Sequence, residues 1–343
     1  MPLADRLTPA ARVREVPAGG ALDLEALIAE GMPVILRGHA ADWPLVREGR
    51  HSAQAAAAYM RRFDRGRPVT GYIGDPAIRG RFHYDASGTA LNFQARPFAL
   101  AEFLAQVLGD RSGTAYYMGS TDLDTYLPGF RSENDLNPTG ELFARHVPLA
   151  SIWIGNRTIA SAHYDMANNA AICAVGCRRF TLFPPDQIAN LYPGPLAPTP
   201  GGQVVSMVDF AAPDLERFPR FAQAIERAQV AELEPGDLLV YPALWWHHVE
   251  ALDDFNVLVN YWWNAAPDFL DSPMDTVMHA MLSLRDRPAA EKQAWRAIFD
   301  HYVFGPAESV TGHLPPAAQG PLAPLDDQGA RRLRAYLLHR LNR

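Results

Sequence analysis

A run of short apolar segments between about residue 150 and residue 263 constrains the fold of this chain more than any other feature of its sequence. Most of the segments are rich in β-branched or aromatic residues, and Gly or Pro stands in most of the gaps, as at Gly176 and Pro242. Short strands separated by such turn residues are typical of an all-β sandwich or barrel. The predicted strands are residues 151–154, 170–175, 179–183, 230–233, 238–241, 247–250 and 256–262.

The segments on either side of this run follow other patterns. Upstream, short helices alternate with single strands; the predicted helices are residues 22–28, 53–63 and 100–108, and the predicted strands are 33–37, 68–74 and 115–118. Downstream of Pro267 the pattern is helical, at residues 274–284, 291–302 and 328–341. Within the run, we predict a Pro/Gly loop over 193–202 and an amphipathic helix over 215–228.

Three regions follow from these patterns. Residues 1–145 supply α/β elements that pack on the barrel and extend it, residues 146–266 form the barrel core, and residues 267–343 form a helical region. The last predicted helix carries an apolar stripe beside its arginines. That stripe suits either packing on its own domain or a dimer contact with a second copy of the chain.

The composition fits a globular protein with a large core, since 48% of the 343 residues are hydrophobic and 20% are charged. The net charge of −7 argues against a surface that holds the phosphate backbone of a nucleic acid. We expect no secretory signal in residues 1–16 and no membrane span, because no apolar run reaches ~18 residues. The only cysteines are Cys173 and Cys177, so we expect a reduced, cytoplasmic protein.

Two identical tripeptides, His83-Tyr84-Asp85 and His163-Tyr164-Asp165, are candidate sources of metal ligands. Side chains at positions i and i+2 of a strand project to the same side, so the imidazole and the carboxylate of one tripeptide can reach one ion. A histidine from a later strand would complete the two-histidine, one-carboxylate triad that holds non-haem Fe(II) and leaves coordination positions open. The alternative for any single histidine is a structural one, held by hydrogen bonds in the core.

The context favours the second tripeptide. His83-Tyr84-Asp85 runs into a predicted loop and has no histidine shortly downstream on a matching strand. His163-Tyr164-Asp165 leads into an apolar strand, and His247 and His248 follow on a later one. Because strand side chains alternate between the two faces, one of these two histidines faces the barrel interior and the other faces away, and the pattern does not distinguish them.

Two adjacent arginines, Arg178 and Arg179, follow the turn at Gly176. By the same alternation one of them faces inward, where its guanidinium can bind the distal carboxylate of a 2-oxo acid through two parallel hydrogen bonds. The alternative is a pair of solvated turn residues. Asn169 and Asn260 lie in or beside apolar strands, where they suit either cosubstrate orientation or the capping of strand ends.

A series of motifs runs in order through the same region, from about residue 150 to residue 264. The motifs are Ala162-His-Tyr-Asp165, Thr181-Leu-Phe-Pro-Pro-Asp-Gln187, Leu191-Tyr-Pro193, Val208-Asp-Phe210, Pro213-Asp-Leu-Glu-Arg-Phe-Pro219, Glu234-Pro-Gly-Asp237, Tyr241-Pro-Ala-Leu-Trp-Trp-His-His-Val-Glu250 and Asn260-Tyr-Trp262. In content, order and spacing they resemble the JmjC-type oxygenases, in the cupin-like branch that contains the asparaginyl hydroxylase called factor inhibiting HIF.

The resemblance implies a fold that is mainly β with α additions. Its centre would be a double-stranded β-helix, or jelly-roll barrel, flanked by N-terminal α/β elements and by C-terminal helices. In this family the C-terminal helices pair two subunits, so the resemblance also implies a homodimer.

The resemblance further implies a set of site residues. His163, Asp165 and His247 match the Fe(II) ligands, and Arg178 stands where the hydroxylase has a lysine for the distal carboxylate of 2-oxoglutarate. Additional cosubstrate contacts match Tyr117, Asn169 and Asn260. Tyr116 remains an alternative to Tyr117, and Arg179 to Arg178.

These features predict an Fe(II)- and 2-oxoglutarate-dependent oxygenase that consumes O2 and releases succinate and CO2. We expect it to hydroxylate a protein side chain or a small molecule rather than a nucleic acid. The alternatives are an N-demethylase or RNA hydroxylase of the same family, and a non-catalytic barrel that only binds a partner. From position alone, we expect residues 193–202, Phe82–Phe93 and Trp263 to shape the entrance to the site.

Overall fold

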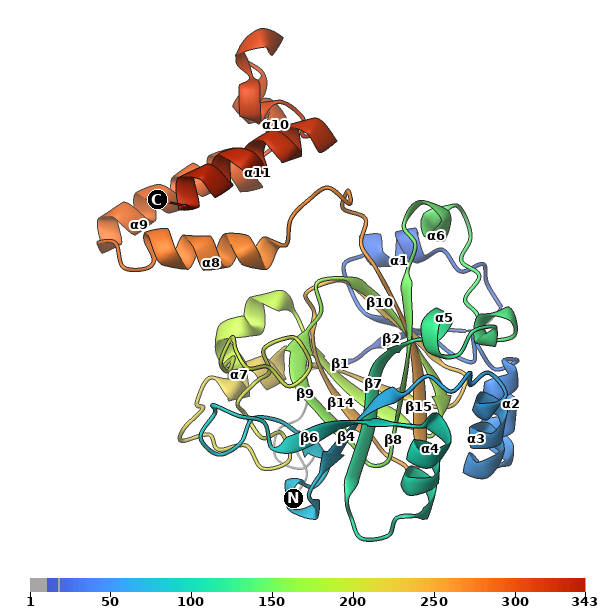
Figure 1. Ribbon diagram of the computed structural model, residues 1–343. Helices are drawn as coiled ribbons and strands as arrows, with labels where there is room; N and C mark the ends of the chain where they lie inside the picture. The colour runs from blue at the N-terminus through green and yellow to red at the C-terminus, as the bar shows by residue number, and fades with distance from the viewer. Residues whose placement is uncertain (1–10, 18, 343) are drawn as a thin grey trace. The chain divides into compact units, whose positions relative to one another are not determined.

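The computed structural model describes residues 11–17 and 19–342, and the chain divides into two compact units, Met1–Asn264 and Ala265–Arg343 (Figure 1). Most of the residues on which the expectation about a secretory signal rests lie outside the described range. Within that range, no helix combines the length and the apolar character needed to cross a membrane.

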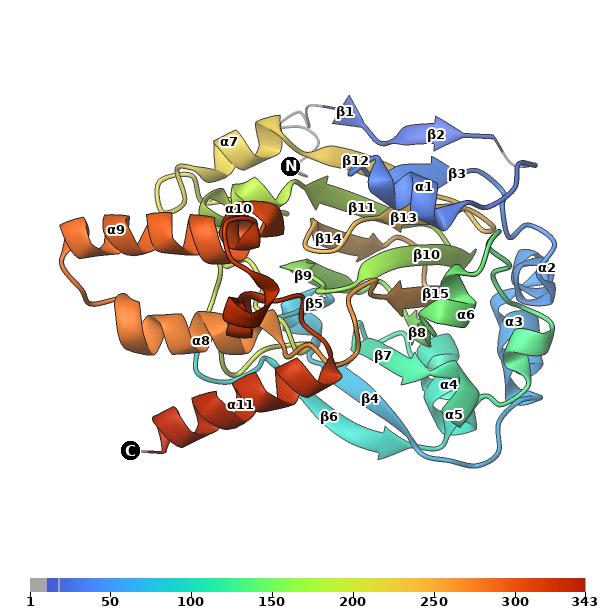
Figure 2. The same cartoon turned by 90° about the horizontal axis from the view of Figure 1, so that it is seen from above.

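The first unit is built on two β-sheets (Figure 2). The six-stranded sheet has, in spatial order, β1 (Ala11–Arg12), β12 (Gln229–Leu233), β11 (Arg178–Phe183), β14 (Trp246–Ala251), β9 (Ile159–Tyr164) and β5 (Arg81–Phe82). The nine-stranded sheet has β2 (Arg14–Val16), β3 (Val34–Leu36), β13 (Leu238–Tyr241), β10 (Asn168–Val175), β15 (Asn256–Trp263), β8 (Leu149–Gly155), β7 (Ala115–Asp122), β4 (Val69–Gly74) and β6 (Phe93–Phe98).

The barrel strands are exchanged between the sheets as in a jelly roll. Strands β8, β10, β13 and β15 lie together in the nine-stranded sheet, whereas β9, β11, β12 and β14 lie together in the six-stranded sheet. Apolar side chains from both sheets, such as Ala171 and Leu239 from one and Phe180 and Leu182 from the other, form one buried cluster, so the sheets pack face to face. The predicted fold class, mainly β with α additions, is therefore confirmed.

Helices cover the other face of the nine-stranded sheet. A second and larger apolar cluster includes residues of α2 (Pro44–His51), α3 (Ala53–Arg61) and α4 (Leu100–Gly109), together with those residues of β10 and β15 that face away from the barrel interior. Burial on both faces explains why β10 reads as a nearly continuous apolar segment rather than as an alternating one. The shorter helices of this unit are α1 (Leu24–Ala29), α5 (Leu123–Tyr126) and α6 (Leu142–Arg145).

The predicted helix over residues 215–228 is wrong in its first half. Only α7 (Phe221–Glu226) is helical there. Pro219 has no amide hydrogen and disfavours helical backbone at Phe218. Upstream of it, the Asp214 carboxylate instead accepts hydrogen bonds from the amides of Glu216 and Arg217 and closes a turn.

The second unit is helical, as the sequence predicts. It contains α8 (Pro273–Leu284), α9 (Ala289–Phe299), a π-helical turn over Asp300–Phe304, α10 (Ala307–Thr311) and α11 (Asp327–Leu341). Ser272 caps α8 and Asp326 caps α11 by accepting a hydrogen bond from an amide in the first turn. Arg334 of α11 pairs with Asp271, with 2.7 Å between Nη2 and Oδ1, and so ties the last helix to the segment before α8.

Candidate active site

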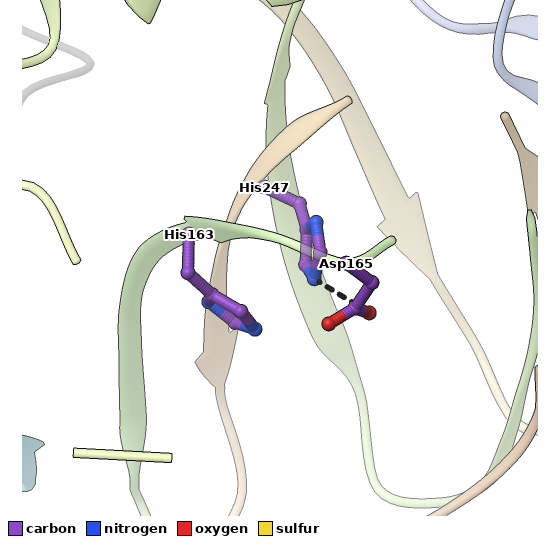
Figure 3. A group of neighbouring side chains, drawn as sticks. All are labelled: His163, Asp165 and His247. Atoms are coloured by element: carbon purple, nitrogen blue, oxygen red, sulfur yellow. Dashed lines mark ion pairs between the residues drawn. The ribbon is translucent and has the colours of Figure 1, made fainter. Parts of the chain in front are cut away.

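Three side chains from two neighbouring strands converge between the sheets. His163 of β9 lies directly opposite His247 of β14, and Asp165 follows the end of β9. One ligand atom from each of the three residues lies within 4.8 Å of the others, and Figure 3 shows the side chains turned toward a common point. The rings of the two histidines are 4.2 Å apart between centroids, and His247 Nε2 lies 3.6 Å from Asp165 Oδ2.

Hydrogen bonds to the backbone prepare both histidines to bind a metal. The Nδ1 atom of His163 lies 2.8 Å from the carbonyl oxygen of Ser161, and that of His247 lies 3.0 Å from the carbonyl of Trp245. Each Nδ1 therefore donates a hydrogen, and each Nε2 keeps its lone pair. Burial, together with the neighbouring His163, lowers the pKa of His247 to about 4, so this imidazole is neutral at pH 7, as a metal ligand must be.

The Asp165 carboxylate is also held in place. The indole N–H of Trp262 donates to Asp165 Oδ2 at 3.0 Å and to the Asn169 side-chain oxygen at 2.5 Å. The amide of Leu244, just before β14, donates to the carbonyl of Asp165 at 2.8 Å. The turn after β9 is thereby fixed against the start of β14, which brings the carboxylate beside His247.

The triad lies in a pocket of about 410 Å³. Apart from the three triad residues, Arg178 is the only charged side chain of its wall in the part of the chain that the structure describes. Much of the remaining wall is aromatic and runs as a chain of rings in contact, with centroids 5.2–5.9 Å apart. These rings belong to Tyr72, Phe93, Phe82, Tyr117, Trp153 and Trp262.

Arg178 is a buried cation with unused hydrogen-bond donors. Its side chain is only 3% exposed, and its Nε and Nη2 atoms have no hydrogen-bond partner among the described residues. Burial lowers the pKa of Arg178, but a guanidinium stays protonated at neutral pH. A buried, unpaired charge is costly, so this position fits an anionic ligand that enters the pocket.

The pocket therefore fits the cofactor set that the sequence predicts. The three ligand atoms suit Fe(II), and Arg178 suits the distal carboxylate of 2-oxoglutarate. The Asn260 side-chain oxygen is a further buried polar atom without a partner in the described part of the chain, and Asn260 also lines the pocket. Residues that leave polar atoms unpaired around one cavity are arranged for a polar ligand.

Comparison with known proteins agrees with this geometry. The family model of the cupin-like domain matches residues 21–269, which is most of the chain. The chain belongs to the cupin-like family. The resemblance to the JmjC-type oxygenases that the sequence predicts is thereby confirmed. These oxygenases use Fe(II), 2-oxoglutarate and O2.

The curated relatives of this cupin-like chain differ in name. HSPB1-associated protein 1 of Rattus norvegicus is 36% identical over 123 residues, which are 35% of this chain and 25% of the relative. Lysine-specific demethylase 8 of Xenopus tropicalis is 26% identical over 236 residues (68% and 48%), and tRNA wybutosine-synthesizing protein 5 of Danio rerio is 37% identical over 105 residues (31% and 29%). The chain thus spans from a quarter to about half of the length of these relatives.

Within the cupin-like pocket, strand alternation separates the paired alternatives. Arg178 faces the pocket, whereas Arg179 faces away and bonds to Glu232, with 3.0 Å between Nη2 and Oε1. Tyr117 likewise lines the pocket, whereas the Tyr116 hydroxyl donates to Asp110 at 2.6 Å. His248 packs outside the pocket against the ring of Phe210, 4.2 Å between centroids.

Two predicted residues are placed differently from the rest. Asn169 is fully buried and does not line the pocket; its side-chain oxygen accepts hydrogen bonds from Trp262 and Asn260, which do line it. Trp263, expected at the entrance, is instead buried against Phe143, 5.7 Å between centroids. Of the other expected entrance segments, Phe82, Phe93 and residues 199–202 do line the pocket.

The first tripeptide takes no part in the cupin-like site. His83 Nε2 lies 3.0 Å from the carbonyl of Ser206, and Asp85 accepts hydrogen bonds from the amide and hydroxyl of Ser87 in a surface turn. This is the structural alternative that the sequence leaves open for a single histidine. It applies to His83 and not to His163.

Sequence reasoning missed the pocket role of Trp262, although a signal for it was present. Trp262 is two positions after Asn260, so both side chains project to the same face of β15. A prediction that places Asn260 in the pocket therefore also places Trp262 there. Because large aromatic residues are usually structural, Trp262 was assigned to the core by its residue type rather than to the pocket by its position on β15.

Replacing Trp262 with phenylalanine should weaken metal binding by about 10- to 100-fold, because the ring remains but the hydrogen bond to Asp165 is lost. Trp153→Phe is the matched control, since the indole nitrogen of Trp153 is buried and has no partner in the described part of the chain. The dissociation constant for Mn(II) can be measured by calorimetry. Equal effects of the two substitutions would show that the Trp262 hydrogen bond does not position Asp165.

Proposed function

We propose that this protein is an Fe(II)- and 2-oxoglutarate-dependent oxygenase that hydroxylates a C–H bond of an uncharged protein side chain or small molecule. One observation carries the proposal: two histidines and a carboxylate converge in the same pocket as a buried arginine whose Nε and Nη2 atoms have no hydrogen-bond partner among the described residues. A metal and a dicarboxylate together satisfy both features. A barrel that served only to bind a partner would have no need for either.

Each residue of the site has a separate task. His163, Asp165 and His247 hold the metal on one side and leave the pocket side open. Arg178 binds the distal carboxylate of 2-oxoglutarate. Its positive charge offsets the negative charge of that carboxylate, and the attraction is strong because Arg178 is buried. Tyr117, whose pKa burial raises to about 12, stays protonated and can donate a hydrogen bond to the same carboxylate.

The bound Fe(II), with 2-oxoglutarate and O2, supplies the oxidising power for breaking the C–H bond, and succinate and CO2 are the other products. The protein's own part is to orient the substrate and to keep water out. The aromatic chain from Tyr72 to Trp262 does both, because it surrounds the reacting position with apolar surface.

The names of the relatives suggest two other outcomes, removal of an N-methyl group from lysine and modification of a tRNA base. Hydroxylation of an uncharged group is favoured because, among the described residues, Asp165 is the only carboxylate of the wall, and it would bind the metal. A cationic amine would find no counter-charge there. The chain's net charge of −7 likewise disfavours a nucleic acid.

Anaerobic titration of the metal-free protein with Fe(II) and 2-oxoglutarate should produce a weak visible absorption band that neither component produces alone. On admission of O2, succinate should form even without substrate, at a slow uncoupled rate. A folded protein that binds Fe(II) but shows neither the band nor succinate would contradict the oxygenase assignment.

We also propose that the second unit forms a homodimer with a second copy of the chain. Its helices expose apolar side chains, among them Leu282 at 80% and Phe304 at 76%. The other exposed large apolar residues of the unit, in its helices or in the segments between them, are Leu270, Val277, Met278, Trp295, Ile298, Tyr302, Val303, Leu325, Leu333, Tyr336, Leu337, Leu338 and Leu341. Monomeric proteins rarely expose large apolar patches, and this number of exposed apolar side chains in one helical unit supports a subunit interface.

Light scattering after gel filtration should give twice the chain mass for the wild type. The double substitution Leu282→Asp and Phe304→Asp should give a monomer, because two carboxylates would have to lose their water at the interface. Gln293→Asp, an acidic change at another exposed position of the same unit, is the control and should remain dimeric. A monomeric wild type would refute the proposal.

The two thiols support a reducing, cytoplasmic environment, which we propose as the location of the protein. Cys173 and Cys177 are both free, and the Cys173 thiol is buried. Burial raises the pKa of Cys173 to about 12, which keeps this thiol protonated and unreactive.

A further inference from the structure

Strand β6 is the last strand of the nine-stranded sheet (Figure 2), and two of its residues line the pocket. Within the described residues, β4 is its only neighbour in the sheet, in an antiparallel register that places Ala95 opposite Tyr72. Phe93 and Ala95 both line the pocket, and the residues from Gln94 to Pro97, Ala95 included, are exposed. One strand therefore connects the interior of the site with the surface.

The strands behind β6 determine where its backbone groups point. The amide of Tyr116 donates to Asn156 Oδ1 at 3.1 Å, and its carbonyl accepts from the amide of Asn156 at 3.3 Å, so both groups face β8. The direction of the backbone N–H and C=O groups alternates along a strand, so those of Tyr117 point toward β4. They bond with the backbone of Tyr72, the partner of Tyr117 in the register. The N–H and C=O groups of Tyr72 therefore point away from β6. Because Tyr72 and Ala95 are opposite each other, the N–H and C=O groups of Ala95 point the other way, to the free edge.

Phe93 has the same orientation as Ala95, because it lies two residues away. Among the described residues, neither has a hydrogen bond outside the sheet ladder. The edge therefore presents two N–H and two C=O groups in alternation, with a repeat of about 6.6 Å along the strand. The backbone of another extended polypeptide matches this pattern. Nucleic acid phosphates offer acceptors alone, and a small metabolite lacks donors and acceptors that alternate regularly at this spacing.

The register also decides where the side chains of a paired strand would project. Directly opposed residues of an antiparallel pair place their side chains on the same face of the sheet. The row Tyr117, Tyr72 and Ala95 crosses three strands on the pocket face. A residue paired with Ala95 would extend this row, and its side chain would project on the pocket face.

The rest of the edge is protected against pairing. Pro97 has no amide hydrogen, and the charged Arg96 lies beside it over the ring of Phe98, 4.0 Å from its centroid. Proline and charge are the means by which sheets prevent unwanted pairing at an edge. Here they protect the end of β6 away from the pocket mouth, whereas Phe93 and Ala95 remain available.

We propose that Phe93–Ala95 of β6 is a docking strand for an extended polypeptide substrate, which adds to the sheet edge and directs an uncharged side chain into the pocket. The inference rests on the proposed function for the chemistry that follows docking, and on the sheet edge for the docking itself. Main-chain hydrogen bonds would supply affinity, and the aromatic pocket wall would select the side chain.

The test uses a displayed library of random peptides of about seven residues. The full-length protein, loaded with Mn(II) and 2-oxoglutarate, is the target. We expect enriched peptides with uncharged side chains at alternate positions. Their affinity should fall about tenfold for Ala95→Pro, because one outward amide donor is lost while the ladder to β4 remains. Ala95→Val, which keeps the amide and has a side chain close to proline in volume, is the matched control for the added bulk and should bind more tightly than Ala95→Pro.

A second measurement guards against misfolding of Ala95→Pro. N-methylation of single backbone amides in an enriched peptide should weaken its binding to the wild type at alternate positions only. No enrichment, enrichment that is insensitive to both changes, or selective binding of mixed-sequence RNA instead would each overturn the proposal. Calorimetry of Mn(II) and 2-oxoglutarate with the same protein tests the proposed function separately, so the two failures are distinguishable.

Discussion

Asp165→Ala should reduce 2-oxoglutarate turnover by more than about 100-fold, whereas Asp85→Ala should leave it unchanged. Loss of a residue that only orients a metal ligand typically weakens metal binding by 10–100-fold, so loss of the ligand itself should have a larger effect. The two residues occupy the same place in identical tripeptides, yet only Asp165 lies with His163 and His247. Asp85 instead closes a surface turn with Ser87.

Succinate formation and Mn(II) affinity, measured on both variants, check this prediction. Thermal melting of each variant shows whether the barrel remains folded, and Asp85→Ala controls for the loss of a carboxylate next to a His-Tyr pair. If Asp85→Ala abolished turnover and Asp165→Ala did not, the iron site would lie elsewhere. Parallel loss of folding and activity in Asp165→Ala would call for Asp165→Asn, which keeps the shape of the side chain but removes its charge.

Arg178→Met should have opposite effects on stability and on cosubstrate use. Two nitrogen atoms of the guanidinium, Nε and Nη2, are buried without a hydrogen-bond partner among the described residues, so replacement by a similar apolar chain should raise the free energy of unfolding by about 1–3 kcal/mol. The 2-oxoglutarate concentration needed for half-maximal turnover should rise by about 100-fold, because a buried, hydrogen-bonded charge pair is lost.

Chemical denaturation with and without Mn(II) and 2-oxoglutarate separates the two effects. The wild type should gain ~2.7 kcal/mol at a ligand concentration of 100 times the dissociation constant, and Arg178→Met should gain far less under the same conditions. Arg179→Met is the control, since Arg179 is half-exposed and already paired with Glu232. A destabilised Arg178→Met protein with an unchanged 2-oxoglutarate requirement would mean that Arg178 is structural.

Much of this site could be predicted from residues and spacing. The His-x-Asp spacing needs only the period of two along a strand, which is a local property. The same period guarantees that Arg178 and Arg179, or Tyr116 and Tyr117, face opposite ways. The run of β-branched segments with Gly and Pro between them gave the barrel, because strand propensity and turn chemistry are also local.

Errors arose where a local pattern was overridden or ambiguous. Pro219 truncated the helix expected over 215–228, because a missing amide outweighs an amphipathic pattern. Trp263 and Trp262 are neighbours of the same type, and only the face of β15 that each occupies makes one structural and the other part of the pocket wall. Asn169 supports Trp262 and Asn260 from behind, a relation that no spacing in the sequence reveals.

The sequence by itself determined the strand series, the spacing of the candidate ligands and the alternation of neighbouring side chains. The tertiary structure decided which face of each strand lines the pocket and which His-Tyr-Asp tripeptide meets a distant histidine. The physical reason is range. Strand periodicity depends on adjacent residues, whereas the pairing of β9 with β14 brings together His163 and His247, which are 84 residues apart (247 − 163).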